Sequence, residues 1–230
     1  MEIKTYSYRF ADEILSYPDY MIVKDELLSI CRDCPIPIYS GKSKKQKSKD
    51  VIQQIMNTYF HIQFTKYGWE AEPFATPVAN EDALRSDFRK TFVLDNGKKI
   101  TIQIEVEFGN VASSYRNYFK FQLSYSYAMT DICVLIVPSS DLSKRIDSGV
   151  SYFEKVIREI PQAKLSVTVP ILVIGLFDRY EDGTMIPGWD IKSQGISLDV
   201  AQNKAQINLD EHEKIVTQYI ERSFIVDETP

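Results

Sequence analysis

The sequence predicts an α/β fold in which helices cover both faces of a mixed β-sheet. The stretch Asp87–Asn110 reads as a β-hairpin, because apolar and polar residues alternate along its second strand from Ile100 onward, as side chains on opposite faces of a strand require. Two continuous apolar runs, Asp131–Val137 and Val167–Leu176, enclose a segment with helical spacing. That order is typical of buried parallel strands joined by a crossover helix.

The elements before the hairpin have identifiable start and stop signals. A short helix is predicted over Phe10–Leu15 and stops before Pro18, and a second covers Asp19–Arg32, with apolar residues at helical spacing. Two prolines end the second helix, because proline cannot continue it. A third helix is predicted over Asp50–Phe64, with Asp50 as its N-terminal cap.

After the hairpin, Val111–Ala128 is predicted to form a helix capped by Asn110. Its aromatic residues leave almost no purely polar face, so it is either a central core helix or a helix covered in part by a second subunit. The crossover helix is predicted over Ser140–Ile160. Beyond it the sequence indicates a turn at Pro187–Asp190 and a last helix over Asp210–Phe224.

The length of 230 residues indicates a single domain, 1–230, that can bury a full core. Within it, 35–50 is a basic loop and 178–230 is rich in loops. No apolar run reaches membrane-spanning length, and the first residues lack a secretory signal, so we expect a soluble cytoplasmic protein. Cys31 and Cys34 have no second pair at zinc-binding spacing, and we expect them to be reduced structural residues.

The net charge of −5 argues against a nucleic-acid partner, but the distribution of charge argues for one. The segment Gly41–Lys49 carries five lysines in nine residues and no acid. Such a concentration of positive charge could neutralise DNA phosphates. A solvated flexible loop is the alternative interpretation of the same lysine run.

Two registers compete for the hairpin. A two-residue Asn-Gly loop would pair Asp87 with Val106, whereas a three-residue loop with Gly97 in the left-handed conformation pairs Asp87 with Glu105. The second register is favoured, because only it keeps the apolar faces of the two strands together.

The favoured register places Asp87, Glu105 and Glu107 on one face of the hairpin. Opposed carboxylates repel each other, so a cation is expected between them, and ligands that are all oxygen point to Mg²⁺. The alternative is an exposed polar face on an amphipathic hairpin. The sequence offers little support for other kinds of active site. It has only two histidines for a histidine-centred nuclease or a Ser-His-Asp hydrolase, and no glycine-rich phosphate-binding loop follows a predicted strand.

The residues Glu105–Asn110, followed by Val111–Arg116, closely resemble the active-site strand and following helix of the type II restriction endonucleases of the BamHI, BglII and BstYI group. Further matches occur in order at 141–154, 171–177 and 186–190. The resemblance implies the restriction-endonuclease-like, PD-(D/E)XK nuclease fold. It covers the chain from about Asp87 to Asp190.

The resemblance also implies the active-site residues. Asp87 and Glu105 correspond to its two acids, and Glu107 stands at the position that the PD-(D/E)XK signature usually gives to lysine; Ser86 replaces the proline of that signature. These three acids and the carbonyl of Val106 would bind Mg²⁺. The implied reaction is Mg²⁺-dependent hydrolysis of double-stranded DNA that leaves 5′-phosphate ends.

Several residues match DNA-contacting positions of the family. They are Asn110, Ser113, Arg116, Ser148, Gly149 and Asp190, with Lys42, Lys44, Lys45 and Lys47 beside the groove. An amide can read adenine, a guanidinium guanine, and a carboxylate can accept from cytosine. The resemblance implies a palindromic site containing GATC, although Arg116 and Asp190 are also suited to ordinary surface ion pairs.

A palindrome implies a homodimer in which each subunit cuts one strand. The resemblance places the dimer contact on the segments Val111–Ala128 and Ser140–Ile160. It also implies a bacterial or archaeal host and a DNA methyltransferase as functional partner. Two rival functions remain on the same fold: a catalytically inactive DNA-binding protein, and a repair or structure-specific nuclease.

Overall fold

A computed structural model of the protein describes residues 1–78, 83–163, 166–202 and 206–226. Its main sheet has six strands in the order β1-β7-β6-β5-β4-β3. Their bounds are β1 Glu2–Tyr8, β3 Glu70–Ala71, β4 Phe88–Val93, β5 Lys99–Val106, β6 Ile132–Pro138 and β7 Ile171–Phe177. Strands β5, β6 and β7 are parallel, and β1 and β4 run antiparallel to their neighbours. The predicted mixed sheet is confirmed.

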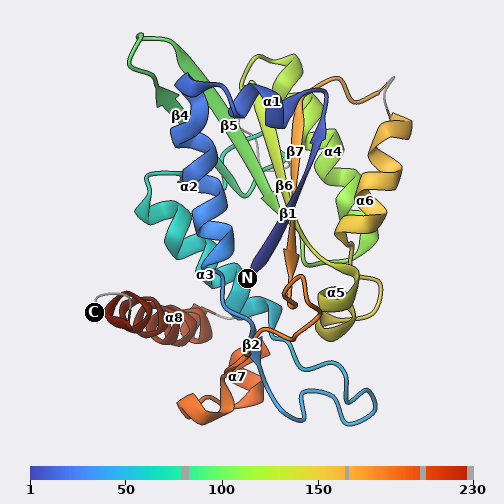
Figure 1. Cartoon of the computed structure of the whole chain (residues 1–230), viewed down its shortest axis with the longest axis vertical. Coiled ribbons are helices and arrows are strands. Elements are labelled where there is room, and N and C mark those ends of the chain that lie inside the picture. The colour runs from blue at the N-terminus through green and yellow to red at the C-terminus, as the bar shows by residue number, and fades with distance from the viewer. Residues whose placement is uncertain (79–82, 164–165, 203–205, 227–230) are drawn as a thin grey trace.

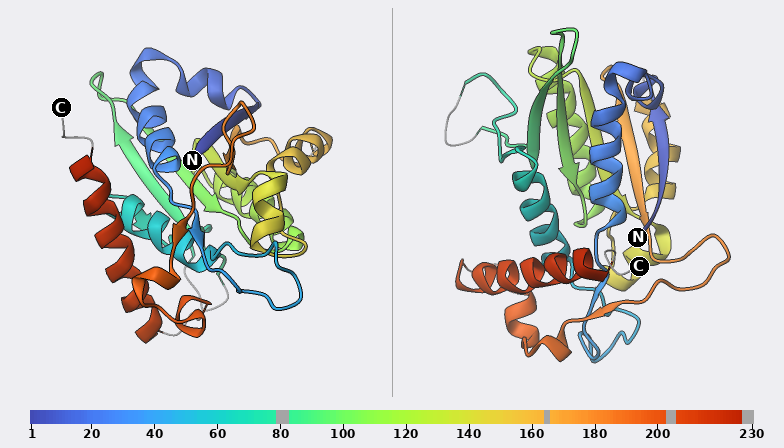
Figure 2. Two further views of the ribbon diagram at one scale, coloured as in Figure 1. Left: turned by 60° about the horizontal axis from the view of Figure 1, so that its bottom comes forward. Right: turned by 60° about the vertical axis from the view of Figure 1, so that its left-hand side comes forward.

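Helices cover both faces of this sheet (Figures 1 and 2). A separate apolar core lies between the sheet and the helices on each face. On one face lie α1 Ala11–Leu15, α2 Met21–Arg32, α3 Gln53–Lys66 and α5 Ser140–Ile146. On the other lie α4 Val111–Ser126 and α6 Phe153–Glu159. The residues of β6 and β7 are buried on both sides, as parallel strands between two helical layers should be.

The β4–β5 hairpin has the predicted register. Phe88 pairs with Ile104, and Phe92 with Ile100. The turn closes through a hydrogen bond of 2.8 Å from the Leu94 amide to the Lys98 carbonyl oxygen. Gly97 has a φ of 76°, a conformation that glycine adopts at little cost. The three-residue loop is therefore confirmed, and Asp87, one residue before β4, lies opposite Glu105.

Two strands of the main sheet were absent from the sequence prediction. β1 pairs with β7 along seven residue pairs and forms an edge of the sheet. Most of its residues are only partly buried, so its sequence carries little of the apolar signal by which a buried strand is recognised. The second, β3, is two residues long and pairs with β4.

The single crossover helix predicted over Ser140–Ile160 is wrong, because α5 ends at Ile146 and α6 begins at Phe153, followed by the 3-10 helix η2 Ile160–Ala163. Between them Gly149 has a φ of 77°, which interrupts helical geometry. The segment instead makes a bridge between Val150 and Asn110. A contact with a distant part of the chain therefore replaces two turns of helix.

Two local predictions are also wrong. Asp50 does not cap α3, which begins at Gln53; its carboxylate accepts two hydrogen bonds of 2.9 Å from Arg145. The turn predicted at Pro187–Asp190 contains β8 Trp189–Asp190, which pairs in parallel with β2 Pro37–Ile38.

The segment after β7 is more helical than predicted. It contains the 3-10 helix η3 Lys192–Gln194, α7 Leu198–Gln202 and α8 Gln206–Val226. α8 packs against α3 across the lower end of the molecule (Figure 2). A further 3-10 helix, η1 Pro18–Tyr20, precedes α2. Among the described helices, none has the length and apolar character needed to cross a membrane.

Cys31, Cys34 and Cys133 are free thiols in the core, as predicted for the first two. Burial raises the pKa of all three, and a thiol that stays protonated is a poor nucleophile and metal ligand. The cysteines are therefore structural.

Candidate active site

Three acids lie close together at the end of β5, on the sheet face that α4 covers. Glu105 is the penultimate residue of β5, Glu107 follows the strand, and Asp87 lies across from Glu105. Glu105 is 1% exposed and Glu107 is 6% exposed, while Asp87 is half-buried. The alternative of an exposed polar hairpin face is therefore wrong for both glutamates.

Each carboxylate accepts a hydrogen bond from a nearby donor. Asp87 Oδ2 accepts from the backbone amide of Val106 at 2.7 Å. Glu107 accepts from the Gly109 amide at 2.6 Å through Oε1 and from another donor through Oε2. Glu105 Oε2 accepts from a lysine, whereas its Oε1 is buried and has no hydrogen-bond partner in the part of the chain that the structure describes.

The side-chain donors to the two glutamates come from α4, and sequence reasoning missed both. Asn117 donates to Glu107 Oε2 at 3.0 Å, and the Lys120 ammonium forms an ion pair with Glu105. Both side chains are buried. The spacing of three residues places them on one side of the helix. Asn117 and Lys120, two polar residues three positions apart in a helix rich in aromatic residues, were the sequence feature that could have indicated these contacts.

The acid cluster has too little positive charge around it. Burial, and then the charge of Asp87, raise the pKa of Glu105 to about 8, although Lys120 opposes the shift. Burial also raises the pKa of Asp87 and of Glu107. Desolvation disfavours the ionised form of each carboxyl group, and the single ammonium of Lys120 supplies too little positive charge to balance three carboxylates.

These shifts predict how stability depends on pH when a chelator is present. Folded Glu105 holds its proton up to about pH 8, whereas the unfolded chain releases it near 4.5. The folded state therefore binds more protons in this window, and the free energy of unfolding should fall as the pH rises through it. Urea denaturation at several pH values measures this, and Glu105→Gln should flatten the dependence. A free energy that rises over the window would contradict the pKa assignment.

The donor set fits a hard divalent cation. The orphaned Oε1 of Glu105, the carboxylate of Asp87 and the carbonyl of Val106 are oxygen ligands, which such cations prefer. However, among the described residues no three or more carboxylate, histidine or cysteine side chains are arranged to hold a metal ion. The predicted cage of three carboxylates is not formed, because Glu105 and Glu107 are turned toward donors on α4 and on the backbone.

Asp87 and Val106 open onto a cavity of about 690 Å³. Its walls come from three parts of the chain: Gln54, Asn57, Thr58, Phe60 and His61 of α3, Ala71 and Glu72 beside β4, and Leu209 and Glu213 of α8. The cavity gives a large ligand access to Asp87 from the side opposite α4. The polar side chains of α3 were not predicted as part of a site.

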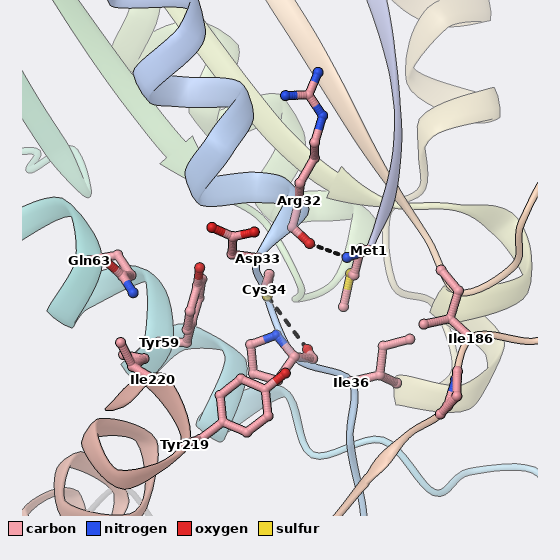
Figure 3. Close-up of a pocket in the computed structure, with 12 residues that line it drawn as sticks. Met1, Arg32, Asp33, Cys34, Ile36, Tyr59, Gln63, Ile186, Tyr219 and Ile220 are labelled. Atoms are coloured by element: carbon pink, nitrogen blue, oxygen red, sulfur yellow. Dashed lines mark hydrogen bonds between the residues drawn. The ribbon is translucent and has the colours of Figure 1, made fainter. Parts of the chain in front are cut away.

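A separate cavity of about 290 Å³ lies between the end of α2, α3 and α8 (Figure 3). Its polar groups are largely satisfied within the protein: the Cys34 thiol contacts the Pro35 carbonyl oxygen, and the Tyr59 hydroxyl donates to Ile30 at 3.0 Å. It contains no member of the acid cluster. We therefore assign the candidate active site to the cavity of about 690 Å³ that Asp87 lines.

Several predicted DNA-contacting residues gather around the start of α4. Asn110 caps this helix by accepting from the Ala112 amide at 3.0 Å. Ser148 and Gly149 line a cavity of about 480 Å³ together with Val111. The side chain of Ser113 lies outside the described residues.

Two other predicted contacts lie apart from this group. Arg116 is on the exposed side of α4, and it forms no hydrogen bond or ion pair within the described part of the chain. Asp190 is exposed on β8, where it accepts from the Lys192 amide at 3.0 Å. Neither residue forms, with any residue that the structure describes, the surface ion pair that the alternative interpretation suggested.

The lysines of the basic loop separate into two kinds. Lys44, Lys45 and Lys47 are exposed. Lys42 is half-buried and donates to the backbone carbonyl oxygens of Val51 at 2.5 Å and Ile146 at 2.6 Å, and burial lowers its pKa. Unlike the other three, Lys42 holds the base of the loop and does not extend into solvent.

α4 carries both buried and exposed aromatic residues. Tyr118 and Phe121 are buried against the sheet. Three other aromatic residues of the helix, Tyr115, Phe119 and Tyr125, are exposed, and so is Tyr127, which follows its last residue. The interpretation of α4 as a core helix therefore holds for only part of its aromatic residues, and cover of the exposed ones by a second subunit stays a prediction.

Comparison with known proteins assigns the family. Residues 3–176 match the model of the restriction endonuclease BglII/BglIII family. The structure is similar to BglII bound to a DNA 16-mer, with a TM-score of 0.61 and 18% identity over 79% of this chain and 78% of that one.

It is also similar to free BglII, with a TM-score of 0.52 and 15% identity over 79% of this chain and 82% of that one. No curated protein sequence matches. The structural likenesses show the fold, and the family model spans most of the chain. The chain therefore belongs to the BglII/BglIII restriction endonuclease family and is a type II restriction endonuclease.

Proposed function

We propose that this enzyme hydrolyses double-stranded DNA with Mg²⁺ bound by Asp87, Glu105 and the carbonyl of Val106, with Glu107 acting on the attacking water, and that it leaves 5′-phosphate ends. Members of the family generally use a divalent metal. The observation that carries the proposal is the buried acid cluster: the pKa of Glu105 is raised to about 8, and its Oε1 has no hydrogen-bond partner among the described residues. A buried, undercharged acid cluster beside a large cavity is typical of a catalytic site.

The residues would divide the work according to their position. Asp87, at the cavity wall, Glu105 Oε1 and the Val106 carbonyl would hold the ion. Bound Mg²⁺ supplies Lewis-acid polarisation of the scissile phosphate and a lowered pKa for the attacking water. The ion would also offset the charge of the clustered carboxylates.

Glu107 is the candidate that orients the attacking water or accepts its proton. Hydrogen bonds from the Gly109 amide and Asn117 fix its carboxylate. Burial raises its pKa, which makes it a stronger base than an exposed glutamate. Lys120 holds Glu105 by one oxygen and leaves the other free.

We further propose that the site is a palindrome containing GATC. The support is the position of polar groups at the start of α4, where the Val111 amide donates to the Gly149 carbonyl oxygen at 2.9 Å. Asn110, Arg116 and Asp190 would contact the inner bases, and Ser148 with Gly149 the outer ones. The amide, guanidinium and carboxylate groups are suited to adenine, guanine and cytosine respectively.

Digestion of DNA of known sequence, followed by mapping of the ends, tests this function. We expect discrete fragments with 5′-phosphates when Mg²⁺ is present and none with a chelator. A smear, or cutting confined to branched DNA, would indicate a repair or structure-specific nuclease. Binding without any cutting would indicate an inactive DNA-binding protein. A DNA methyltransferase that protects the same site is the expected functional partner.

The enzyme is proposed to act as a homodimer through the exposed aromatic residues of α4, Phe119 among them. Phe119→Glu should yield a monomer that no longer makes double-strand breaks, because the substitution places a charge in an apolar contact. Light scattering and plasmid digestion measure the two effects. Tyr17→Glu is the matched control, since Tyr17 is 64% exposed and Phe119 is 60% exposed. A Phe119→Glu protein that stays dimeric would contradict this interface.

A further inference from the structure

The last lysine of the basic loop is bonded to the candidate base-reading segment. Lys49 Nζ donates to Asp147 Oδ1 at 2.5 Å and to Ser148 Oγ at 2.7 Å. Asp147 Oδ1 also accepts from the Ser148 amide at 2.7 Å. Ser148 is therefore held at its hydroxyl by Lys49 and at its amide by Asp147.

The contacts of Lys49 distinguish it from its neighbours. Its side chain is only 13% exposed, whereas Lys44, Lys45 and Lys47 are exposed. A long side chain fixed by two hydrogen bonds loses rotamer freedom, and an ammonium paired with a carboxylate has less charge to offer a phosphate. Lys49 is therefore suited to holding the protein's own structure, and the three exposed lysines are suited to DNA phosphates.

Two further contacts fasten the same parts of the chain. Lys42 Nζ donates to the Ile146 carbonyl oxygen at 2.6 Å. Asp50 forms two hydrogen bonds of 2.9 Å with the guanidinium of Arg145, a fork geometry that fixes orientation. The basic loop and the segment 145–148 are therefore joined at both ends of the loop.

The segment 147–151 also contacts the residues that directly follow β5, the strand that contains Glu105. The Ser151 amide donates to the Gly109 carbonyl oxygen at 3.1 Å, and the Gly109 amide donates to Glu107 at 2.6 Å. The basic loop, the segment 147–151 and Glu107 are thus connected by successive hydrogen bonds. The cavity of about 480 Å³ beside the start of α4 is lined by both Lys49 and Ser148.

We propose that Lys49 is a specificity-determining residue of this endonuclease, which holds Ser148 and Gly149 in the geometry that reads the outer base pairs. The proposal rests on the proposed function. Lys44, Lys45 and Lys47 bind phosphates, and Lys49 joins their loop to the base-reading segment. Contacts with the DNA phosphates and contacts with the outer bases then form together.

Two methionine variants separate positioning from phosphate binding. Lys49→Met keeps the apolar stem and removes the donor. We expect it to reduce the ratio of cleavage at the mapped site to cleavage at sites altered in one outer base pair by about tenfold, the order of one good base contact. Lys47→Met is the matched control. It should weaken binding to all sequences alike, and should lower the slope of log affinity against log salt concentration by about one.

Lys49→Arg, which retains charge and donors, should restore much of the discrimination, and Asp147→Asn should reduce it from the other side of the contact. Lys49→Met with unchanged discrimination and a reduced salt slope would overturn the proposal, because Lys49 would then be another phosphate-binding lysine. If Lys49→Met does not fold, Asp147→Asn with wild-type discrimination would overturn it. Failure of the wild-type enzyme to cut at a specific site would instead refute the proposed function.

Discussion

Asp87→Asn is expected to lower the rate of DNA cleavage by roughly a thousandfold or more, the order of losing a central electrostatic group of an active site. Specific DNA binding should be retained. Asp87 lies opposite Glu105 and opens onto the cavity of about 690 Å³. Asparagine preserves the shape of the side chain and removes the charge that a divalent ion requires. Single-turnover cleavage and a binding assay in Ca²⁺ measure the two effects.

Glu72→Gln provides the matched control for Asp87→Asn. Glu72 lines the same cavity, and its charge raises the pKa of Asp87, but its side chain is exposed and we assign it no ligand role. It should cut at close to the wild-type rate. Equal losses in both variants would mean that only the total charge of the cavity matters. Retained cutting by Asp87→Asn would remove Asp87 from the catalytic set.

Lys120→Met is expected to impair both cleavage and stability. The Lys120 ammonium and the Glu105 carboxylate are buried between α4 and the sheet. Above about pH 8, where the Glu105 carboxyl is ionised, removing one member of a buried ion pair typically costs about 3–5 kcal/mol, because the other charge is left uncompensated. Cleavage should fall because Glu105 then loses the donor that fixes one of its oxygens. Urea denaturation and single-turnover cleavage measure the two losses.

The double variant Lys120→Met with Glu105→Gln separates the two effects. It removes both charges, so much of the lost stability should return, whereas cleavage should not. The coupling energy from the four proteins measures the interaction of the pair. Additive losses of stability, with no coupling, would show that Lys120 and Glu105 do not act as a pair.

The hairpin and its acids were predictable because local signals determine them. The turn residue Gly97 and the apolar matching of Phe88 with Ile104 select one register, and that register places Asp87 opposite Glu105. The alternation along β5 then places Glu107 on the same face. Each of these inferences uses only residues within one hairpin.

The partners of those acids were not predictable in the same way. Asn117 and Lys120 reach the glutamates only because α4 packs on that face of the sheet. The break between α5 and α6 likewise depends on a bridge between Val150 and Asn110, which are 40 positions apart in the numbering. Such contacts follow from tertiary packing, and neither propensity nor periodicity in one segment reports them.

The lysine run shows the same limit. Its composition indicated a basic loop, and the exposed Lys44, Lys45 and Lys47 agree with that. Composition could not show that Lys42 and Lys49 are bonded to a segment about a hundred residues later. Five similar residues therefore have at least two different structural roles.

Calorimetric titration of Mn²⁺ into the DNA-free enzyme tests the central claim that the acids around Glu105 form a divalent-cation site. We predict saturable binding by the wild-type protein with release of protons near pH 7, because the ion would lower the raised pKa of Glu105. Glu105→Gln should lose most of this binding and the proton release. Equal binding by the two proteins would place the cation elsewhere and contradict the account.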